Sequence, residues 1–147
     1  MLKEPSISES SLSISYVINS SLEQVYSAWT EKKEIVLWMG GSNVRINNVE
    51  ADLKVDGKFE IEMESPDGVF IAYGEYRAIE SDKLIFSWCW KESMVDESLM
   101  TVKFSPTADG TLIDLTHEQL PSKQAVGYHM EGWISSFKKL EKYLIDA

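Results

Sequence analysis

The middle of the chain, from residue 43 to residue 121, consists of segments in which apolar and polar residues alternate, separated only by short turns. Alternation with a period of two is typical of a β-strand with one buried and one exposed face. The clearest case is Phe59, Ile61 and Met63, which are interleaved with glutamates. Turns such as Asp56-Gly57 leave no room for the crossover helix that parallel neighbouring strands require. The sequence therefore predicts an antiparallel meander and excludes a doubly wound parallel fold.

Helical patterns flank this region. A first strand begins at Leu12, and either Ser20 or Ser21 then begins a capping-box pattern for a short helix with one apolar stripe. A second short helix follows, ending near Trp38. A long final helix begins at residue 121 and carries apolar residues at spacings of four and three: Val126, Met130, Trp133, Phe137, Leu140 and Leu144. We expect an α+β fold, with a curved antiparallel sheet of about seven strands wrapped round the C-terminal helix and two short helices after the first strand.

The chain is the length of one domain, with 147 residues of which 44% are hydrophobic. A domain of this size buries about 68–70% of the surface of its unfolded chain, which suffices for a core without metals or disulfides. Residues 1–11 are polar and are expected to form a flexible N-terminal segment. Residues 12–147 are expected to form a single domain.

The charge and the cysteine content exclude several classes of protein. The net charge is -10, with 24 acidic against 14 basic residues, and nucleic-acid binding requires clustered lysine and arginine. The acidity favours solubility, or steering toward a basic partner. The single cysteine, Cys89, cannot form an internal disulfide. No apolar run approaches the roughly 20 residues of a membrane span, and no signal peptide begins the chain, so a cytoplasmic location is expected.

Motifs that carry catalysis are missing from the sequence. The two histidines, His117 and His129, show no metal-ligand spacing, and no nucleophile or phosphate-binding motif occurs. Glu60, Glu62 and Glu64 share the polar face of one strand, which is typical of a solvated surface. We therefore expect no catalytic residue, no metal and no cofactor.

Aromatic richness and two helix glycines indicate a cavity. Five tryptophans exceed what core filling requires, and ligand pockets are mainly apolar with few polar groups. Gly127 and Gly132 interrupt the last helix, either for close packing or to leave room for a ligand. His117 is either a satisfied core group or the polar anchor of a pocket. The candidate lining consists of Trp38, Phe59, Ile61, Tyr76, Trp88, Met100, His117, Met130 and Trp133.

Several short motifs occur in the order that is found in a known family. They are Ala28-Trp29-Thr30, Trp38, residues 52–57, Gly74-Glu75-Tyr76, residues 83–88, Gly110-Thr111, residues 115–118 and Gly132-Trp133. With them the chain resembles the SRPBCC (START-like, helix-grip) superfamily, and within it the proteins similar to the C-terminal domain of activators of heat-shock protein 90 ATPase. The resemblance implies a sheet that grips the last helix, with a cavity between them.

Three functions remain open, because the superfamily includes ligand binders, chaperone activators and some enzymes, and fold alone does not fix function. The first is a non-enzymatic domain that binds a small, mostly apolar molecule between sheet and helix. The alternative is a co-chaperone-like protein that binds heat-shock protein 90 and modulates its ATPase. A further alternative is an enzyme acting on a hydrophobic small molecule. A monomer or a weak homodimer is expected.

Overall fold

One antiparallel sheet and three helices make up the described chain. The computed structural model describes residues 2–3, 5–92 and 97–146. In chain order the elements are β1 (Ser6–Ile7), β2 (Leu12–Ile18), α1 (Leu22–Thr30), α2 (Lys32–Trp38), β3 (Arg45–Ala51), β4 (Lys58–Ser65), β5 (Gly68–Glu80), β6 (Lys83–Trp90), β7 (Ser98–Thr107), β8 (Gly110–Glu118) and α3 (Lys123–Asp146).

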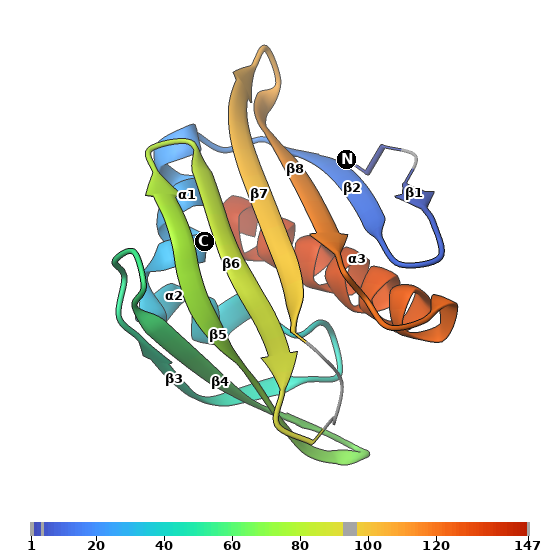
Figure 1. The fold of residues 1–147 in the computed structure, drawn as a ribbon. Helices are drawn as coiled ribbons and strands as arrows, with labels where there is room; N and C mark the ends of the chain where they lie inside the picture. Colours follow the sequence, from blue (N-terminus) through green and yellow to red (C-terminus); the bar gives the residue numbers. More distant parts are fainter. Residues whose placement is uncertain (1, 4, 93–96, 147) are drawn as a thin grey trace.

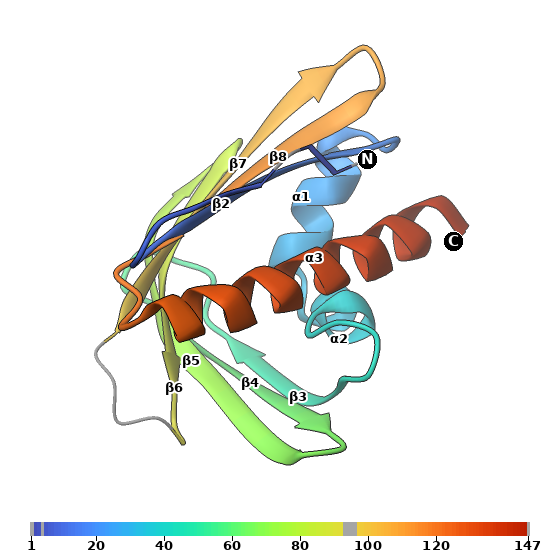
Figure 2. The ribbon, with the colours of Figure 1, turned by 90° about the vertical axis from the view of Figure 1, so that its right-hand side faces the viewer.

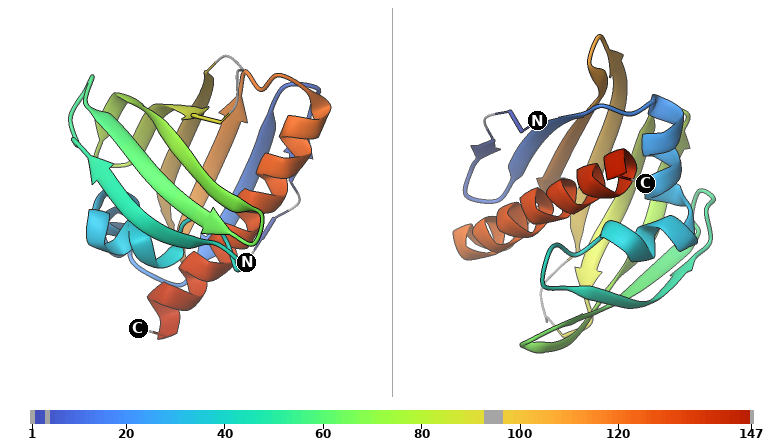
Figure 3. Two further views of the ribbon diagram at one scale, coloured as in Figure 1. Left: turned by 90° about the horizontal axis from the view of Figure 1, so that it is seen from below. Right: turned by 180° about the vertical axis from the view of Figure 1, so that it is seen from behind.

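The sheet curves round the C-terminal helix. Its strand order is β1-β2-β8-β7-β6-β5-β4-β3, so the early strand β2 pairs with β8 and extends the meander that runs from β3 to β8 (Figure 1). Figure 2 shows α3 crossing the concave side of this sheet. The helices α1 and α2 lie on the same side, beside α3 (Figure 3). The predicted α+β helix-grip architecture is confirmed.

The N-terminal segment contributes more structure than the sequence predicts. Ser6 and Ile7 pair with β2 as the short edge strand β1, and Leu2 forms an isolated bridge with Tyr16. Ser8 and Ser11 join the turn between these strands through their hydroxyl groups, which lie 2.7 Å apart. The sequence predicts a loose polar segment here, but the hydroxyl groups of Ser8 and Ser11 hydrogen-bond to each other at a tight turn. The sheet consequently has one strand more than the seven expected, while the flexibility of residues 1–11 stays a prediction.

The apolar residues of the long strands lie on the concave face of the sheet. The residues that alternation assigns to this face are all buried: Phe59, Ile61, Tyr76, Phe86, Trp88, Met100 and Val102. On the other face of β4, the Glu60 carboxylate lies 2.5 Å from the Lys91 ammonium. Serine 21 caps α1 by accepting a hydrogen bond from the Gln24 amide, so the second of the two predicted caps is the one used.

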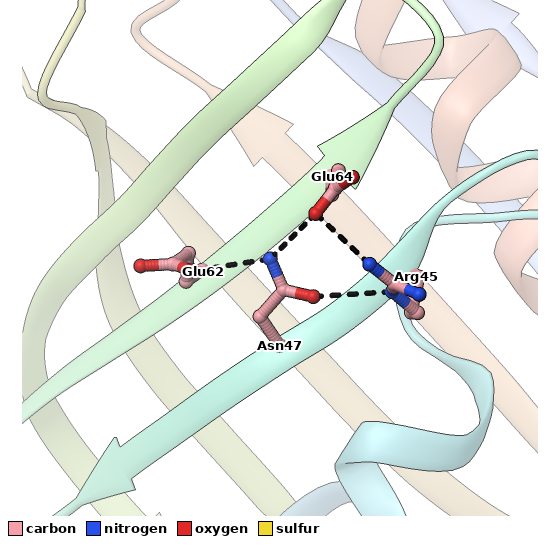
Figure 4. Close-up of polar contacts among 4 residues, drawn as sticks. All are labelled: Arg45, Asn47, Glu62 and Glu64. Atoms are coloured by element: carbon pink, nitrogen blue, oxygen red, sulfur yellow. Dashed lines mark hydrogen bonds and ion pairs between the residues drawn. The ribbon is translucent and has the colours of Figure 1, made fainter.

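Two irregularities bend the sheet. The β3–β4 register shifts between Ile46 and Asn48, and the β5–β6 register shifts between Tyr76 and Ala78. Beside the first shift, Asn47 donates to Glu62 and Glu64 at 3.1 and 3.0 Å (Figure 4).

The same cluster includes an ion pair on the exposed edge of the sheet. Arg45 Nη2 lies 3.1 Å from Glu64 Oε1. The Asn47 hydrogen bond and the Arg45 guanidinium lower the pKa of the Glu64 carboxyl. Charged groups on an edge strand discourage pairing with another chain, so we assign this cluster a structural role.

Candidate functional site

A cavity of about 580 Å³ lies between α3 and the β4–β6 part of the sheet. Met63 of β4, Phe70 of β5, and Trp88 and Trp90 of β6 form the sheet side. Ligand pockets in proteins have volumes of roughly 300–1,000 Å³ and are lined mainly by apolar and aromatic side chains. The cavity therefore has the size and the chemistry of a small-molecule site.

The helix side of the cavity is formed by a stripe of small and polar residues on α3. His129, Gly132 and Ser136 follow one another at spacings of three and four, so they share one face of the helix. A Cβ atom built on Gly132 would meet no atom within 4 Å, and the same is true of Gly127. Close packing therefore does not explain either glycine. Gly132 in particular leaves open space at the cavity wall.

The third wall is the loop between α2 and β3, which includes Met39, Gly40 and Val44. Gly40 has a φ of 92°, and a Cβ there would lie 2.5 Å from Val44 Cγ1, so only glycine fits. The Gly40 amide donates to Ser136 Oγ at 3.1 Å, and Lys139 Nζ donates to the Val44 carbonyl at 3.0 Å. These bonds fasten the loop to α3 and fix the width of the cavity.

Three tryptophans stand around the cavity at large mutual angles. The Trp88 and Trp90 rings are 5.7 Å apart with an interplanar angle of 87°, and those of Trp88 and Trp133 are 5.2 Å apart at 58°. The Nε1 atom of Trp88 is buried and has no hydrogen-bond acceptor among the described residues. Because that atom is buried, Trp88 meets the cavity through its carbon atoms. The aromatic walls are thus apolar at the surface that a ligand would touch.

His129, which lines the cavity, is held in one neutral form. Its Nδ1 lies 2.7 Å from the Ala125 carbonyl, which can only accept, so Nδ1 carries the proton. Its Nε2 accepts a hydrogen bond from Trp90 Nε1 at 3.0 Å. Burial lowers the pKa of His129. Both nitrogens are engaged within the protein, so His129 orients Trp90.

His117 repeats this arrangement inside the core and does not line the cavity. It is fully buried, with Nδ1 accepting from Trp133 Nε1 at 3.2 Å and Nε2 lying 2.7 Å from Ser98 Oγ. Ser98 Oγ donates its proton to the Trp88 carbonyl at 2.6 Å, so His117 Nε2 is the donor to Ser98. Burial, and then the nearby His129, lower the pKa of His117 to about 3. Its polar atoms are satisfied by protein groups.

Of the nine predicted lining residues, Trp88 and Trp133 line the cavity. Met130 is half-buried against the core and lies outside the lining. The other six are buried elsewhere on the concave side: Trp38, Phe59, Ile61, Tyr76, Met100 and His117. Whether any of the nine binds a ligand stays a prediction.

Most of the cavity lining lies outside the nine predicted residues, although Gly132 was already one of the two helix glycines for which the sequence suggested either close packing or room for a ligand. Trp90 follows Trp88 at the strand period and so shares its face, a signal that was available. The stripe of His129, Gly132 and Ser136 was a second signal, since it runs beside the apolar stripe of the same helix. The loop residues Met39 and Gly40 carried no such pattern.

Metal-binding clusters and membrane-spanning helices are not found among the described residues. Within residues 2–3, 5–92 and 97–146, no group of three or more histidine, cysteine, aspartate or glutamate side chains could hold a metal ion. Among the same residues no helix is long and apolar enough to cross a membrane. Cys89 is half-buried, and burial raises the pKa of its thiol.

Comparison with family models gives one match that spans most of the chain. Residues 19–145 match the model of a family described as Activator of Hsp90 ATPase homolog 1-like protein. No curated protein sequence matches the chain closely enough to count as a relative.

Solved structures of the same fold come from several bacteria. A protein from Mycobacterium smegmatis is similar with a TM-score of 0.86 at 15% identity, covering 100% of this chain and 99% of its own. A protein from Chromobacterium violaceum has a TM-score of 0.84 at 17% identity, covering 92% and 97%. An AHSA1 protein from Silicibacter pomeroyi has a TM-score of 0.80 at 20% identity, covering 91% and 96%. At these identities the likeness shows the fold alone.

Proposed function

Because the chain belongs to the family of activator of Hsp90 ATPase homolog 1-like proteins, we propose that it is a non-enzymatic protein that binds a small, mostly apolar molecule. The binding site is the cavity between α3 and the sheet. The observation that carries the proposal is the open, apolar space of about 580 Å³ beside Gly132. A glycine inside a helix costs about 1 kcal/mol relative to alanine, and no close contact requires it here.

The polar groups of the cavity support binding rather than catalysis. Ser136 Oγ donates to the Gly132 carbonyl at 2.8 Å and accepts from Gly40. His129 uses both nitrogens for Ala125 and Trp90. A nucleophile needs an adjacent base that accepts its proton, and these hydroxyl and imidazole groups are instead engaged in holding the walls.

A substitution at Gly132 tests the proposal. Gly132→Leu would place an isobutyl group in the space beside the helix, and Gly127→Leu is the matched control, because its Cβ is also free of contacts but it does not line the cavity. Neutral sterols, flavonoids and aromatic metabolites are screened by thermal shift. A ligand at a hundred times its Kd stabilises the fold by about 2.7 kcal/mol.

We expect a hit to shift the melting temperature of the native protein and of Gly127→Leu, but not of Gly132→Leu. If no compound shifts any of the three proteins, or if all three respond alike, the cavity is not the binding site.

Contact with a protein partner is a second candidate function, favoured by the acidic outer face of the sheet. Glu50 and Glu60 are directly opposite one another on β3 and β4, although like charges in such pairs are destabilising. The Lys91 ammonium already pairs with Glu60 at 2.5 Å, so a basic partner would add its attraction mainly at Glu50. Binding to the chaperone of the same organism should weaken with added salt. It should also survive Gly132→Leu, which separates this function from ligand binding.

A further inference from the structure

The cavity is surrounded by aromatic rings on several sides. Phe70, Trp88, Trp90, Tyr128 and Trp133 all line it. Trp88 stands at 87° to Trp90 and at 58° to Trp133, so these rings form inclined walls rather than a flat stack. A cation within about 6 Å of aromatic faces is attracted by their negative electrostatic potential, most strongly by tryptophan. Inclined aromatic walls are the arrangement that encloses a cation.

The charge of the cavity lining also favours a cation. Glu92 is the one charged residue among the described residues that line the cavity, and neither lysine nor arginine is among them. Glu92 Oε1 accepts a hydrogen bond from the Ile71 amide at 2.9 Å, which fixes the carboxylate at the rim. A carboxylate can accept further hydrogen bonds beyond this one. His129 adds no positive charge, because the Trp90 bond and burial hold it neutral.

Lys91, the neighbouring cation in the sequence, interacts electrostatically with Glu92 but forms its ion pair with Glu60. Lys91 does not line the cavity, and its ammonium lies 2.5 Å from the Glu60 carboxylate. The protein as a whole carries a net charge of -10, which favours the approach of cations. An anionic ligand would have to give up its hydration beside Glu92 without a partner of opposite charge.

We infer that the cavity takes an organic cation, a tertiary or quaternary ammonium group attached to an apolar body. The ammonium lies among the aromatic rings and toward Glu92, and the apolar body lies along Met39, Met63 and the open face of Gly132. This inference rests on the proposed ligand-binding function and names the class of ligand.

Three probes of nearly equal shape test the charge preference directly. Benzyltrimethylammonium is the cation, 2,2-dimethylpropylbenzene is its neutral isostere, and phenylmethanesulfonate is the anion. Binding is measured by NMR titration of the native protein and of Gly132→Leu. Only the binding that Gly132→Leu abolishes is counted, because Lys138 and Lys142 line a separate groove and their charges attract the anion.

We expect the cation to bind at least about tenfold more tightly than the neutral isostere, and the anion to show no cavity binding. That ratio corresponds to about 1.4 kcal/mol, which two aromatic contacts and one carboxylate supply. Equal or tighter binding of the neutral probe overturns the inference and leaves the proposed function intact. If none of the three probes binds, the inference fails, and the screen of larger neutral compounds decides the proposed function separately.

Two substitutions identify the groups responsible. Glu92→Gln should weaken cation binding by roughly two- to fivefold, because the carboxylate is solvent-exposed and partly screened. Phe70→Leu removes a ring but keeps an apolar side chain, and it should weaken binding of the cation by a similar factor. Glu92→Gln should leave binding of the neutral probe unchanged, and Phe70→Leu should weaken the neutral probe by less than the cation, because the apolar contact is only partly lost. If both variants bind the cation as the native protein does, the rings and Glu92 do not select the charge.

Discussion

Two stripes of residues on α3 face the concave side of the sheet, and one packs into the core whereas the other borders the cavity. In one stripe the Phe137 and Leu140 side chains are completely buried, and the centroid of the Phe137 ring lies 5.5 Å from that of Tyr16. The other stripe, with Gly132 and Ser136, faces the cavity. Both follow the same helical spacing, so the difference is one of side-chain size. Filling a helix–sheet interface depends on volume as well as on apolar character.

Trp133 marks the boundary between these two regions. Its ring stacks against Trp29 at 6.1 Å on the packed side and lies 5.2 Å from Trp88 on the cavity side. Its indole nitrogen is held by His117, which fixes the ring between them. A rigid partition of this kind lets one region remain open without loss of order in the other.

Removing a phenyl ring from each region should separate them most clearly. Phe137→Ala should cost about 3–5 kcal/mol in free energy of unfolding, because the ring is completely buried. Phe70→Ala should cost less than about 1.5 kcal/mol, since Phe70 is 36% exposed and already borders open space. Urea denaturation of both variants measures this difference. Similar costs would mean that the two regions are packed alike.

Acid should act on the two histidines, one in each region. Their rings are 4.8 Å apart, and burial lowers the pKa of both. A histidine whose folded pKa is lowered has no effect on stability above pH 6.5, and destabilises increasingly as the pH falls toward the folded value. With a folded pKa of about 3, His117 should cost about 2 kcal/mol at pH 5 relative to pH 7.5.

The measurement is urea denaturation at the two pH values for the native protein and for His117→Gln. The variant should be less stable at pH 7.5, because the Trp133 and Ser98 hydrogen bonds are disturbed. It should nevertheless lose about 2 kcal/mol less on acidification. If the native protein and the variant lose the same stability, His117 is not held neutral by the fold.

The smallest expected effect comes from adding one methyl group to each helix glycine. Gly132→Ala and Gly127→Ala should each stabilise the protein by roughly 0.5–1 kcal/mol, because alanine favours helix and neither Cβ meets an atom. Gly132→Ala should also weaken ligand binding in the cavity, whereas Gly127→Ala should leave it unchanged. Thermal denaturation with and without a ligand from the screen measures both effects. A destabilised Gly132→Ala would show that the space is not free.

The fold was predictable because strand alternation decides which side chains face inward. The alternation of Phe59, Ile61 and Met63 with polar residues predicts a half-buried strand, and the turn at Gly57 predicts that this strand is antiparallel to the preceding one. The cavity lining was predictable only in part. Alternation places Phe59 and Trp88 on one face, yet only Trp88 borders open space.

What the sequence could not give is the line along which α3 crosses the sheet. That line is set by contacts between residues far apart in the chain, such as Ser136 with Gly40 and Lys139 with Val44. The choice of which buried residues border a void follows from it. The periodicity of apolar residues is a local property of the sequence. It predicts which face of a strand or helix points inward, but not whether neighbouring side chains fill the space in front of that face.

The pairing of β2 with β8 has a consequence for how the domain forms during synthesis. Tyr16 pairs with Ile113, so β2 has no partner on that edge until residues 111–117 have been synthesised. Contacts between such distant segments fold slowly, and an unpaired apolar strand is prone to aggregate while it waits. Ser13 and Ser15 of β2 alternate with its apolar residues and keep the first part of its outer face polar. These serines favour the solubility of the unpaired strand until β8 has been synthesised.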